Sequence, residues 1–299
     1  MSVFAAVALT ATLTVQAALG QSAMQQFANV SCAYDVAPNP ANYVRTVRDL
    51  RSTTTVTLEG RAWDNTLILG CQIDGARGDG IEIRNVKNLT IAGCTIRDVR
   101  GTGIRFRSSG GTSGVKLIGN RIINAGENGI SAAKRRSNGV DHTNLVIVDN
   151  VVEDSGRRGR SGLTHGIYSQ VSDVTIFRNE VSGKRDGNGI SIRSSGVVSC
   201  NSISGESYDN KPGIRYYADN YTGPSRSLLI RNNRIRGSTP GIDIRTPDGW
   251  AQRKTEALVT DFQILDNRIN SADRVAISRF WREFDAANFV IQGNRRIGG

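Results

Sequence analysis

The chain has 299 residues, of which 33 are Gly and only 6 % are aromatic, and its formal net charge is +11 at pH 7. This composition is typical of a turn-rich β solenoid and argues against a mainly helical protein. The positive charge predicts an anionic partner, and the four cysteines lack the C-x-x-C spacing of a zinc or redox site.

The chain opens with an apolar run, Val3 to Leu19, which ends in small residues up to Gly20. This pattern resembles a secretory signal, so we expect residues 1–23 to be a signal peptide and the mature chain to be secreted or periplasmic. The alternative is an amphipathic cap on the domain that follows. Because Thr and Gln interrupt the run, we expect no membrane span in the mature form.

Residues 24–55 are predicted to form an N-terminal cap with a short helix. The pattern of a capped helix covers residues 39–51, where Asn39 stands at the N-cap and Pro40 in the first turn.

Residues 56–299 repeat two short phrases, and repeats at this spacing predict a solenoid. The first phrase is Gly-Ile, found at Gly80-Ile81, Gly103-Ile104, Gly129-Ile130, Gly166-Ile167, Gly189-Ile190, Gly213-Ile214 and Gly241-Ile242, with a worn copy at Ala276-Ile277. The second is an aliphatic-x-aliphatic-x-x-Asn phrase ending at Asn120, Asn150, Asn179, Asn201, Asn233, Asn267 and Asn294, with Cys71 and Cys94 in the two earliest equivalent places.

Each Gly-Ile phrase alternates with period 2, as in Ile81-Glu82-Ile83-Arg84, and so predicts a strand. With further apolar positions on both sides of each Asn, about three strands form each coil. Parallel strands stacked about 4.8 Å apart would bury an aliphatic column and align every turn position along the axis. Asn suits a tight bend with left-handed backbone geometry, and its stacked amides can bond along the row.

On these phrases, residues 56–299 resemble the right-handed parallel β-helix (pectin-lyase-like) superfamily, of the polysaccharide lyase and epimerase type. The resemblance implies an all-β, right-handed parallel β-helix of about eight to nine coils in a single domain, which we expect to be a monomer. Cys71 and Cys94 should then stack on adjacent coils, either as a disulfide or as a pair of buried thiols.

In each Gly-Ile strand, the residues one and three places after the Ile should face outward. Six arginines on five coils occupy such places and would form a cationic strip along the solenoid: Arg84, Arg105, Arg107, Arg193, Arg215 and Arg245. The strip has a gap at Ser131 and Tyr168.

The coil at this gap carries His165 directly before its Gly-Ile phrase, three residues ahead of Tyr168. We expect these two side chains to face one pocket. Asn128 and Asn188 hold the place of His165 in the neighbouring repeats, so an Asn-His-Asn row should form beside Tyr168. Arginine-rich loops flank this coil, and Arg157, Arg158 and Arg160 are expected to steer a substrate rather than to react.

Removing the proton alpha to a uronate carboxylate requires a base, a proton donor for the leaving oxygen and groups that neutralise the carboxylate. Tyr, His, Asn and Arg can supply all of these with no metal and no other cofactor. We assign Tyr168 as proton donor and candidate base, and His165 as base or as partner of that base. The carboxylate would be neutralised by Arg193, Arg215 and Asn188. Further substrate contacts are expected from Asn128, Arg105, Arg107, Tyr217 and Arg245.

The sequence therefore predicts a metal-independent lyase that cleaves an acidic, uronate-containing polysaccharide. Epimerisation at carbon 5 begins with the same step and stays open. Glycoside hydrolysis needs paired carboxylates, and the outward strand positions offer only Glu82 and Asp243, about seven coils apart.

A non-catalytic polysaccharide-binding solenoid is a further alternative, in which His165 and Tyr168 are only capping and stacking residues. We expect no nucleic-acid partner, because the strip lacks a regular aromatic ladder. The second histidine, His142, lies in a polar insertion and is a candidate substrate-loop residue.

Overall fold

We describe the chain from a computed structural model, which defines residues 31–33, 36–134, 141–159, 161–183, 186–205, 211–218, 225–245, 259–270, 277–280 and 288–298. The predicted signal peptide, residues 1–23, lies outside these residues. Within them no helix is both long and apolar enough to cross a membrane.

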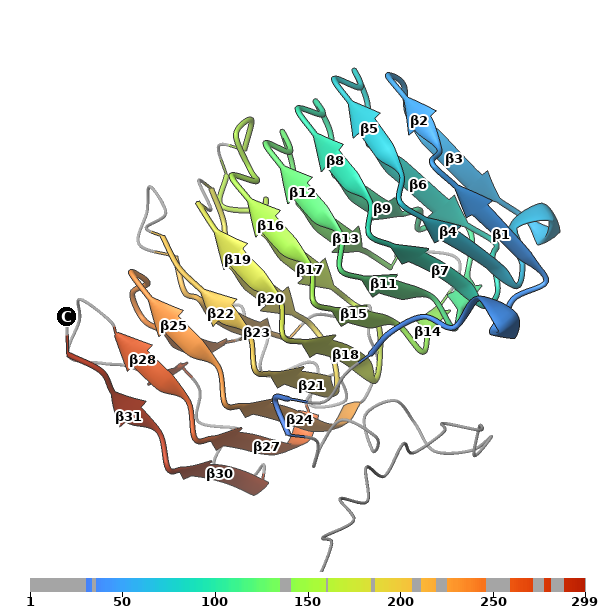
Figure 1. Ribbon diagram of the computed structural model, residues 1–299. Coiled ribbons are helices and arrows are strands. Elements are labelled where there is room, and N and C mark those ends of the chain that lie inside the picture. Colours follow the sequence, from blue (N-terminus) through green and yellow to red (C-terminus); the bar gives the residue numbers. More distant parts are fainter. Residues whose placement is uncertain are drawn as a thin grey trace, which may run out of the picture.

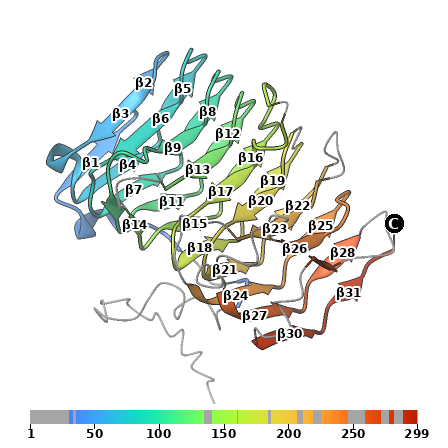
Figure 2. The ribbon, with the colours of Figure 1, turned by 180° about the vertical axis from the view of Figure 1, so that it is seen from behind.

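Three parallel sheets run along the molecule, and successive turns of the chain add strands to each of them (Figures 1 and 2). The A sheet contains β1 (Arg45–Arg48), β4 (Thr66–Leu69), β7 (Leu89–Ala92), β11 (Lys116–Ile118), β15 (Val146–Val148), β18 (Val174–Phe177), β21 (Gly196–Ser199), β24 (Ser225–Arg231), β27 (Val259–Leu265) and β30 (Asn288–Gln292).

The B sheet contains β2 (Arg51–Ser52), β5 (Gln72–Asp74), β8 (Thr95–Arg97), β12 (Arg121–Ile123), β16 (Val151–Glu153), β19 (Glu180–Ser182), β22 (Ser202–Ile203), β25 (Arg234–Arg236), β28 (Arg268–Asn270) and β31 (Arg295–Arg296). The C sheet contains β3 (Val56–Glu59), β6 (Ile81–Arg84), β9 (Ile104–Phe106), β13 (Ile130–Ala132), β17 (Ile167–Ser169), β20 (Ile190–Ile192), β23 (Ile214–Tyr217), β26 (Ile242–Arg245) and β29 (Ile277–Phe280). A small two-stranded sheet pairs β10 (Thr112–Ser113) with β14 (His142–Thr143).

The predicted parallel β-helix of the all-β class is confirmed, with more coils than expected. The A and B sheets each hold ten strands within the described part of the chain, against the eight to nine coils predicted. The first coil begins at Arg45 rather than at Val56, because β1 and β2 already pair with β4 and β5. This coil has no Gly-Ile phrase, so the repeat pattern did not predict it.

The helix predicted over residues 39–51 is wrong beyond its first turn. Only the 3-10 turn η1 (Pro40–Asn42) forms, with Asn39 as its N-cap: the side chain accepts a hydrogen bond from the Ala41 N–H. A second short 3-10 turn, η2 (Arg61–Trp63), follows β3. The alternating residues from Arg45 onward gain more by joining the sheets, where each backbone group finds a partner.

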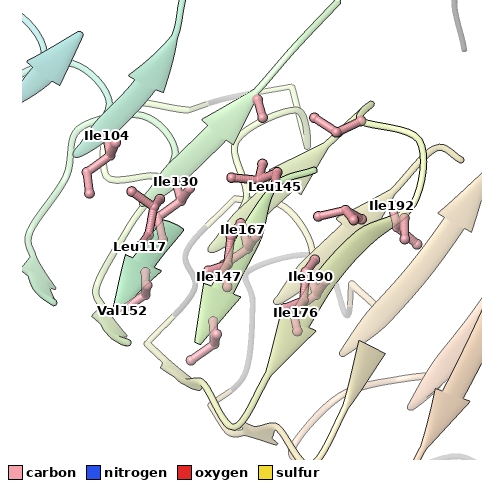
Figure 3. Packing of buried hydrophobic residues seen from close by; sticks show 14 of the residues in the cluster. Ile104, Leu117, Ile130, Leu145, Ile147, Val152, Ile167, Ile176, Ile190 and Ile192 are labelled. Carbon is pink, nitrogen blue, oxygen red and sulfur yellow. The ribbon is translucent and has the colours of Figure 1, made fainter. Parts of the chain in front are cut away.

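An isoleucine column forms the centre of the core (Figure 3). The first Ile of each Gly-Ile phrase pairs in register with that of the next coil, as in Ile104, Ile130, Ile167 and Ile190. All four are fully buried, and burying each one contributes roughly 1.5–3 kcal/mol. The glycine before each Ile is needed because a Cβ on Gly166 would lie 2.6 Å from the Gly189 carbonyl oxygen.

The asparagine row forms as a continuous hydrogen-bonded ladder inside the solenoid. The Nδ2 of Asn150 donates to Oδ1 of Asn179 at 2.9 Å, and Asn179 donates to Asn201 at 3.0 Å. The same Oδ1 atoms also accept the backbone N–H of the preceding coil's Asn. The left-handed backbone geometry predicted for these Asn residues falls instead one residue earlier, for example at Arg178 and Cys200, with φ of 53° and 61°.

Two disulfides cross-link the described chain. Cys71 and Cys94 are bonded on adjacent coils at the start of the ladder, which decides between the two predicted alternatives. Cys32 is bonded to Cys200, 168 residues away, and this bond fastens the segment before β1 onto the corner between β21 and β22. Neither half of that second pair carried a pairing signal in the sequence.

Candidate functional site

The outer face of the C sheet carries the predicted strip, and most of its arginines are paired with carboxylates. Arg84 contacts Glu59 at 2.5 Å and Arg107 contacts Glu82 at 2.6 Å, while Arg105 contacts Glu127. The predicted cationic strip is therefore largely neutralised by ion pairs. Glu59 and Glu82 lie on strands β3 and β6 of the same sheet, and Glu127 comes from a turn between strands.

At the far end of the strip, Arg215 and Arg245 share one carboxylate. Asp243 is completely buried, and its Oδ2 lies 2.7 Å from Nε of Arg215 and 3.4 Å from Nε of Arg245. Burial of the guanidinium lowers the pKa of Arg215. A buried carboxylate needs such partners because an unpaired buried charge is strongly unfavourable. These two arginines hold Asp243 and, unlike Arg105 and Arg107, line neither of the two cavities described next.

A cavity of about 310 Å³ opens on the C sheet over β9, β13 and β17. The predicted site residues Arg105, Arg107, Asn128 and Tyr168 all line it, together with the exposed side chain of Leu163. A second cavity of about 350 Å³ adjoins it, because Arg105 and Arg107 line both. We call the two together the C-sheet groove.

The second half of the C-sheet groove contains carboxylates that sequence analysis missed. Asp79 is 5 % exposed, and its side chain accepts the Thr102 N–H at 2.7 Å and contacts Nε of Arg105 at 3.2 Å. Burial raises the pKa of Asp79, and a hydrogen bond with Glu82 acts in the same direction. Glu127 lines the same cavity. Asp79 occupies the place directly before Gly80, so the rule that picked out His165 could have found it.

The predicted Asn-His-Asn row is confirmed. Asn128 Oδ1 accepts the backbone N–H of His165 at 2.7 Å, and His165 Nδ1 accepts the backbone N–H of Asn188 at 2.9 Å. This arrangement places the ring proton of a neutral imidazole on Nε2. The Nε2 atom is buried with no hydrogen-bond partner among the described residues.

His165 is 2 % exposed, and burial lowers its pKa to about 3, helped by the positive charges of Arg193 and Arg215. The ring is therefore neutral at ordinary pH, and its one lone-pair nitrogen is occupied by the Asn188 N–H. The expectation that His165 and Tyr168 face one pocket is wrong, because Tyr168 lines the C-sheet groove and the buried His165 does not. In this geometry His165 can position its neighbour. His165 was predicted to be either the base or the partner of the base, and this arrangement favours the second role.

Tyr168 lies between His165 and Arg193. Its ring is stacked on the imidazole with centroids 5.5 Å apart and planes 14° apart, and the Arg193 guanidinium carbon lies 5.3 Å from its centroid. Arg193 also lies 4.4 Å from the ring centroid of Tyr217. These aromatic and cationic contacts hold Tyr168 at the wall of the cavity and bring a positive charge beside it.

Asp186 fixes the loop that leads into this coil. Its carboxylate accepts the backbone N–H groups of Gly162 and Thr164, both at 2.9 Å, and the Thr164 hydroxyl at 2.7 Å. The loop residue Leu163 can therefore stand exposed at the cavity while His165 is held in the row behind it. Sequence analysis did not identify Asp186, because it lies between repeat phrases.

His142 is not a loop residue. It lies on β14, is 4 % exposed, contacts the Thr112 hydroxyl at 3.0 Å through Nδ1 and meets the edge of Phe106. Burial lowers its pKa to about 4. Of the loop arginines, Arg158 lines the C-sheet groove, and Arg160 lies outside the described residues. No group of three or more His, Cys, Asp or Glu side chains suited to a metal ion occurs in the described part of the chain.

Residues 58–145 match a protein-family model described as "Right handed beta helix region". A search of curated proteins found no match for the sequence. Among solved structures, the chain is similar to the A-module of mannuronan C-5 epimerase AlgE4 from Azotobacter vinelandii, with 14 % identity and a TM-score of 0.50. That similarity covers 85 % of this chain and 75 % of the epimerase module.

The alginate lyase of Paenibacillus sp. str. FPU-7 is similar at 14 % identity and a TM-score of 0.34, covering 82 % of this chain and 95 % of the lyase. Taken with the sheets of the structure, the family model and the first similarity establish a right-handed parallel β-helix. At 14 % identity, similarity to solved structures indicates the fold and not the activity.

Proposed function

Because the chain is a right-handed parallel β-helix with a polar groove along one sheet, we propose that it is a lyase that cleaves a uronate-containing polysaccharide by β-elimination. One observation carries the proposal. Tyr168, stacked on His165, lines the same cavity as Asn128, Arg105 and Arg107.

In this proposal the substrate carboxylate binds Arg105 and Arg107. Arg105 and Arg107 line both halves of the C-sheet groove. Their ion pairs with Glu127 and Glu82 hold them in place before the substrate arrives. Preorganised cations of this kind stabilise the negative charge that develops on the carboxylate as the proton leaves.

Tyr168 carries the proton in the proposed reaction. Its phenolate oxygen takes the proton from carbon 5, and the electron pair of that bond forms the double bond between carbons 4 and 5. The bond from carbon 4 to the glycosidic oxygen breaks, and the departing oxygen receives the proton from Tyr168. No water is consumed, and the new chain end is an unsaturated uronate.

His165 acts in this scheme as a positioning residue. Its Nδ1 is bound to the Asn188 N–H, so the imidazole cannot accept a proton there without breaking the row. By stacking on Tyr168 it fixes the phenol ring, and its buried Nε2 has no hydrogen-bond partner in the part of the chain described. Such fixed orientation lowers the entropic cost of reaching the reactive geometry.

The deciding experiment incubates the purified protein with alginate, polygalacturonate, glucuronan and glycosaminoglycans and follows the ultraviolet absorbance of an unsaturated product. We expect absorbance to rise with at least one uronate polymer. New reducing ends without absorbance would replace the lyase by a hydrolase. A changed ratio of uronate isomers by NMR, with no cleavage, would replace it by a carbon-5 epimerase. Binding without any product would leave a polysaccharide-binding solenoid.

Glycoside hydrolysis is the second candidate, and one observation favours it. Asp79 and Glu82 are hydrogen-bonded in the C-sheet groove, and burial raises the pKa of Asp79, the direction expected of a general acid. Hydrolysis needs such a carboxyl pair. Asp79 and Glu82 also form ion pairs with Arg105 and Arg107. These ion pairs would explain the two carboxylates as structural residues without any role in hydrolysis.

A further inference from the structure

A second group of arginines lies on the B sheet, near the C-terminal end of the solenoid. Arg234 of β25 pairs in register with Arg268 of β28, which pairs in register with Arg295 of β31. All three are exposed. Parallel strands are about 4.8 Å apart, so three like charges stand one above the other in what we call the arginine column.

The arginine column differs from the arginines elsewhere on the same sheet. Arg97 is ion-paired with Asp74, and Arg121 is ion-paired with Glu153 at 2.8 Å, in each case across coils. Arg234, Arg268 and Arg295 have no such carboxylate partner within the described residues. Like charges opposite each other on neighbouring strands are destabilising, so the column reduces the stability of the fold in the absence of a bound anion.

A groove accompanies the column. A cavity of about 690 Å³ is lined by the three column residues and by Arg231, with Asp266 as the one acidic residue among its lining residues. Ser31 and Cys32 form part of its wall, and the disulfide from Cys32 to Cys200 fixes them there. Among the described residues, the groove therefore presents the three guanidinium groups of the arginine column, with Asp266 as the acidic lining residue, on a wall that is covalently held.

We propose that this groove is a second binding site for an acidic polysaccharide, separate from the C-sheet groove. The repeated charges of the arginine column suit a polymer with an anionic group on successive units, and guanidinium groups suit carboxylate or sulfate. None of the described residues that line the groove is aromatic, so this lining offers no stacking platform of the kind used for single-stranded nucleic acid. This inference rests on the proposed function only for the class of polymer, an acidic polysaccharide.

A polymer bound here would contact β25, β28 and β31 of the B sheet, whereas Tyr168 lies on β17 of the C sheet. The site would hold a long chain near the protein while another part of that chain, or another chain, enters the C-sheet groove. Two linked contacts raise the affinity for long chains well above that for short ones.

The test compares two triple variants in a Tyr168→Phe background, which slows the proposed elimination, and polymer length is checked after each titration so that the result does not depend on whether the chain is a lyase. The first variant is R234Q/R268Q/R295Q. The matched control, R51Q/R97Q/R121Q, removes equal charge from the same sheet. Affinity for long alginate, polygalacturonate and a sulfated glycosaminoglycan is measured by isothermal titration calorimetry at several salt concentrations.

We expect the column variant to bind the preferred polymer on the order of tenfold more weakly and with a flatter salt dependence, because three exposed charge contacts are lost. The control should keep most of the affinity. The column variant should also melt at a higher temperature without polymer, and it should lose the rise in melting temperature that polymer gives the parent. Equal loss in both variants, or none in either, would refute the site, and preferential binding of duplex DNA would refute its proposed occupant.

Discussion

His165 Nδ1 accepts a hydrogen bond from the backbone N–H of Asn188 at 2.9 Å, and this bond joins two adjacent coils of the solenoid. The imidazole thus takes the part that an asparagine side chain plays one coil earlier, where Asn128 accepts from His165 itself. One side chain both continues a structural row and supports the ring of Tyr168. This double use allows the two roles to be separated by substitution.

His165→Asn should keep the row and weaken the proposed reaction. An asparagine can accept the Asn188 N–H, so the variant should fold, but it cannot stack on Tyr168. We expect kcat on the preferred uronate polymer to fall about tenfold or more, with a smaller change in KM, because orientation and not binding is lost. An unchanged kcat would show that the stacking has no part in the reaction.

Tyr168→Phe should abolish most of the activity. Removing a group that transfers a proton costs roughly 10²–10⁴-fold in rate, and the phenyl ring keeps the contact with His165. The rate of absorbance increase measures the effect. Tyr43→Phe is the matched control, because its hydroxyl bonds Thr90 in the A sheet at 2.5 Å, away from the C-sheet groove. If both variants retain full activity, Tyr168 is not the proton carrier.

The stability of the fold should decrease in acid through its two buried histidines. The folded-state pKa values of His165 and His142 are lowered to about 3 and about 4, below the ordinary value of 6.5. Their neutral forms therefore stabilise the fold fully above pH 6.5, and this contribution is lost as the pH falls toward the folded values. Each adds a slope of up to about 1.4 kcal/mol per pH unit in that window.

Urea unfolding between pH 7 and pH 4 measures this loss. In His165→Asn the slope should be smaller by the contribution of one histidine, and His142 should account for the remainder of the histidine effect. The same slope in parent and variant would mean that His165 is protonated in the fold or exposed to solvent.

Asn179→Ala should destabilise the solenoid by several kcal/mol. Asn179 is 1 % exposed, and its side chain bonds Asn150, Asn201 and two backbone carbonyls. Each buried polar group left without a partner costs about 1–3 kcal/mol. Urea unfolding gives the value, and Gln72→Ala, an exposed change on β5, should stay within about 0.5 kcal/mol of the parent. A loss of less than about 1 kcal/mol in Asn179→Ala would mean that water replaces the ladder bonds.

The two disulfides should differ in their contribution to stability. The bonds close loops with sequence separations of 168 and 23 residues, so loop-closure entropy gives about 5 kcal/mol for Cys32–Cys200 and about 3 kcal/mol for Cys71–Cys94. Urea unfolding of C32A/C200A and C71A/C94A compares them. The reverse order would show that packing around the sulfurs outweighs the constraint on the unfolded chain.

Chelation should leave the proposed activity intact. The described residues contain no cluster of metal-ligating side chains, and the scheme at Tyr168 uses none. Absorbance assays after treatment with EDTA should match untreated protein. A loss that calcium or another divalent ion restores would overturn the metal-independent scheme.

The sequence predicts those parts of the molecule that follow from the stacking of one coil on the next. A repeat places equivalent residues in register, so the isoleucine column, the asparagine ladder and the row through His165 could all be identified before the structure. The same logic applied to the residue before Gly80 would have identified Asp79. Asp79 lies in the turn between β5 and β6, outside the outward strand positions on which the predicted strip was based.

Other features depend on contacts between positions that no repeat relates. Glu127 reaches Arg105 from a turn, and Asp186 holds its loop from another turn. The first coil lacks the repeat phrase, although Val56 pairs in register with Ile81 of the next coil. The Cys32–Cys200 bond depends on how the segment before β1 crosses the outside of the solenoid.

That bond also determines which part of the chain can bear a mechanical load. Tension applied to the two ends of the oxidised protein would pass directly from Cys32 to Cys200, across the sulfur atoms. The coils between them, including β17 and the groove around Tyr168, would lie outside the loaded path and keep their shape while later coils peel away. Reduction would return the enclosed segment to that path and lengthen the fully extended chain by up to about 3.3–3.6 Å for every residue released.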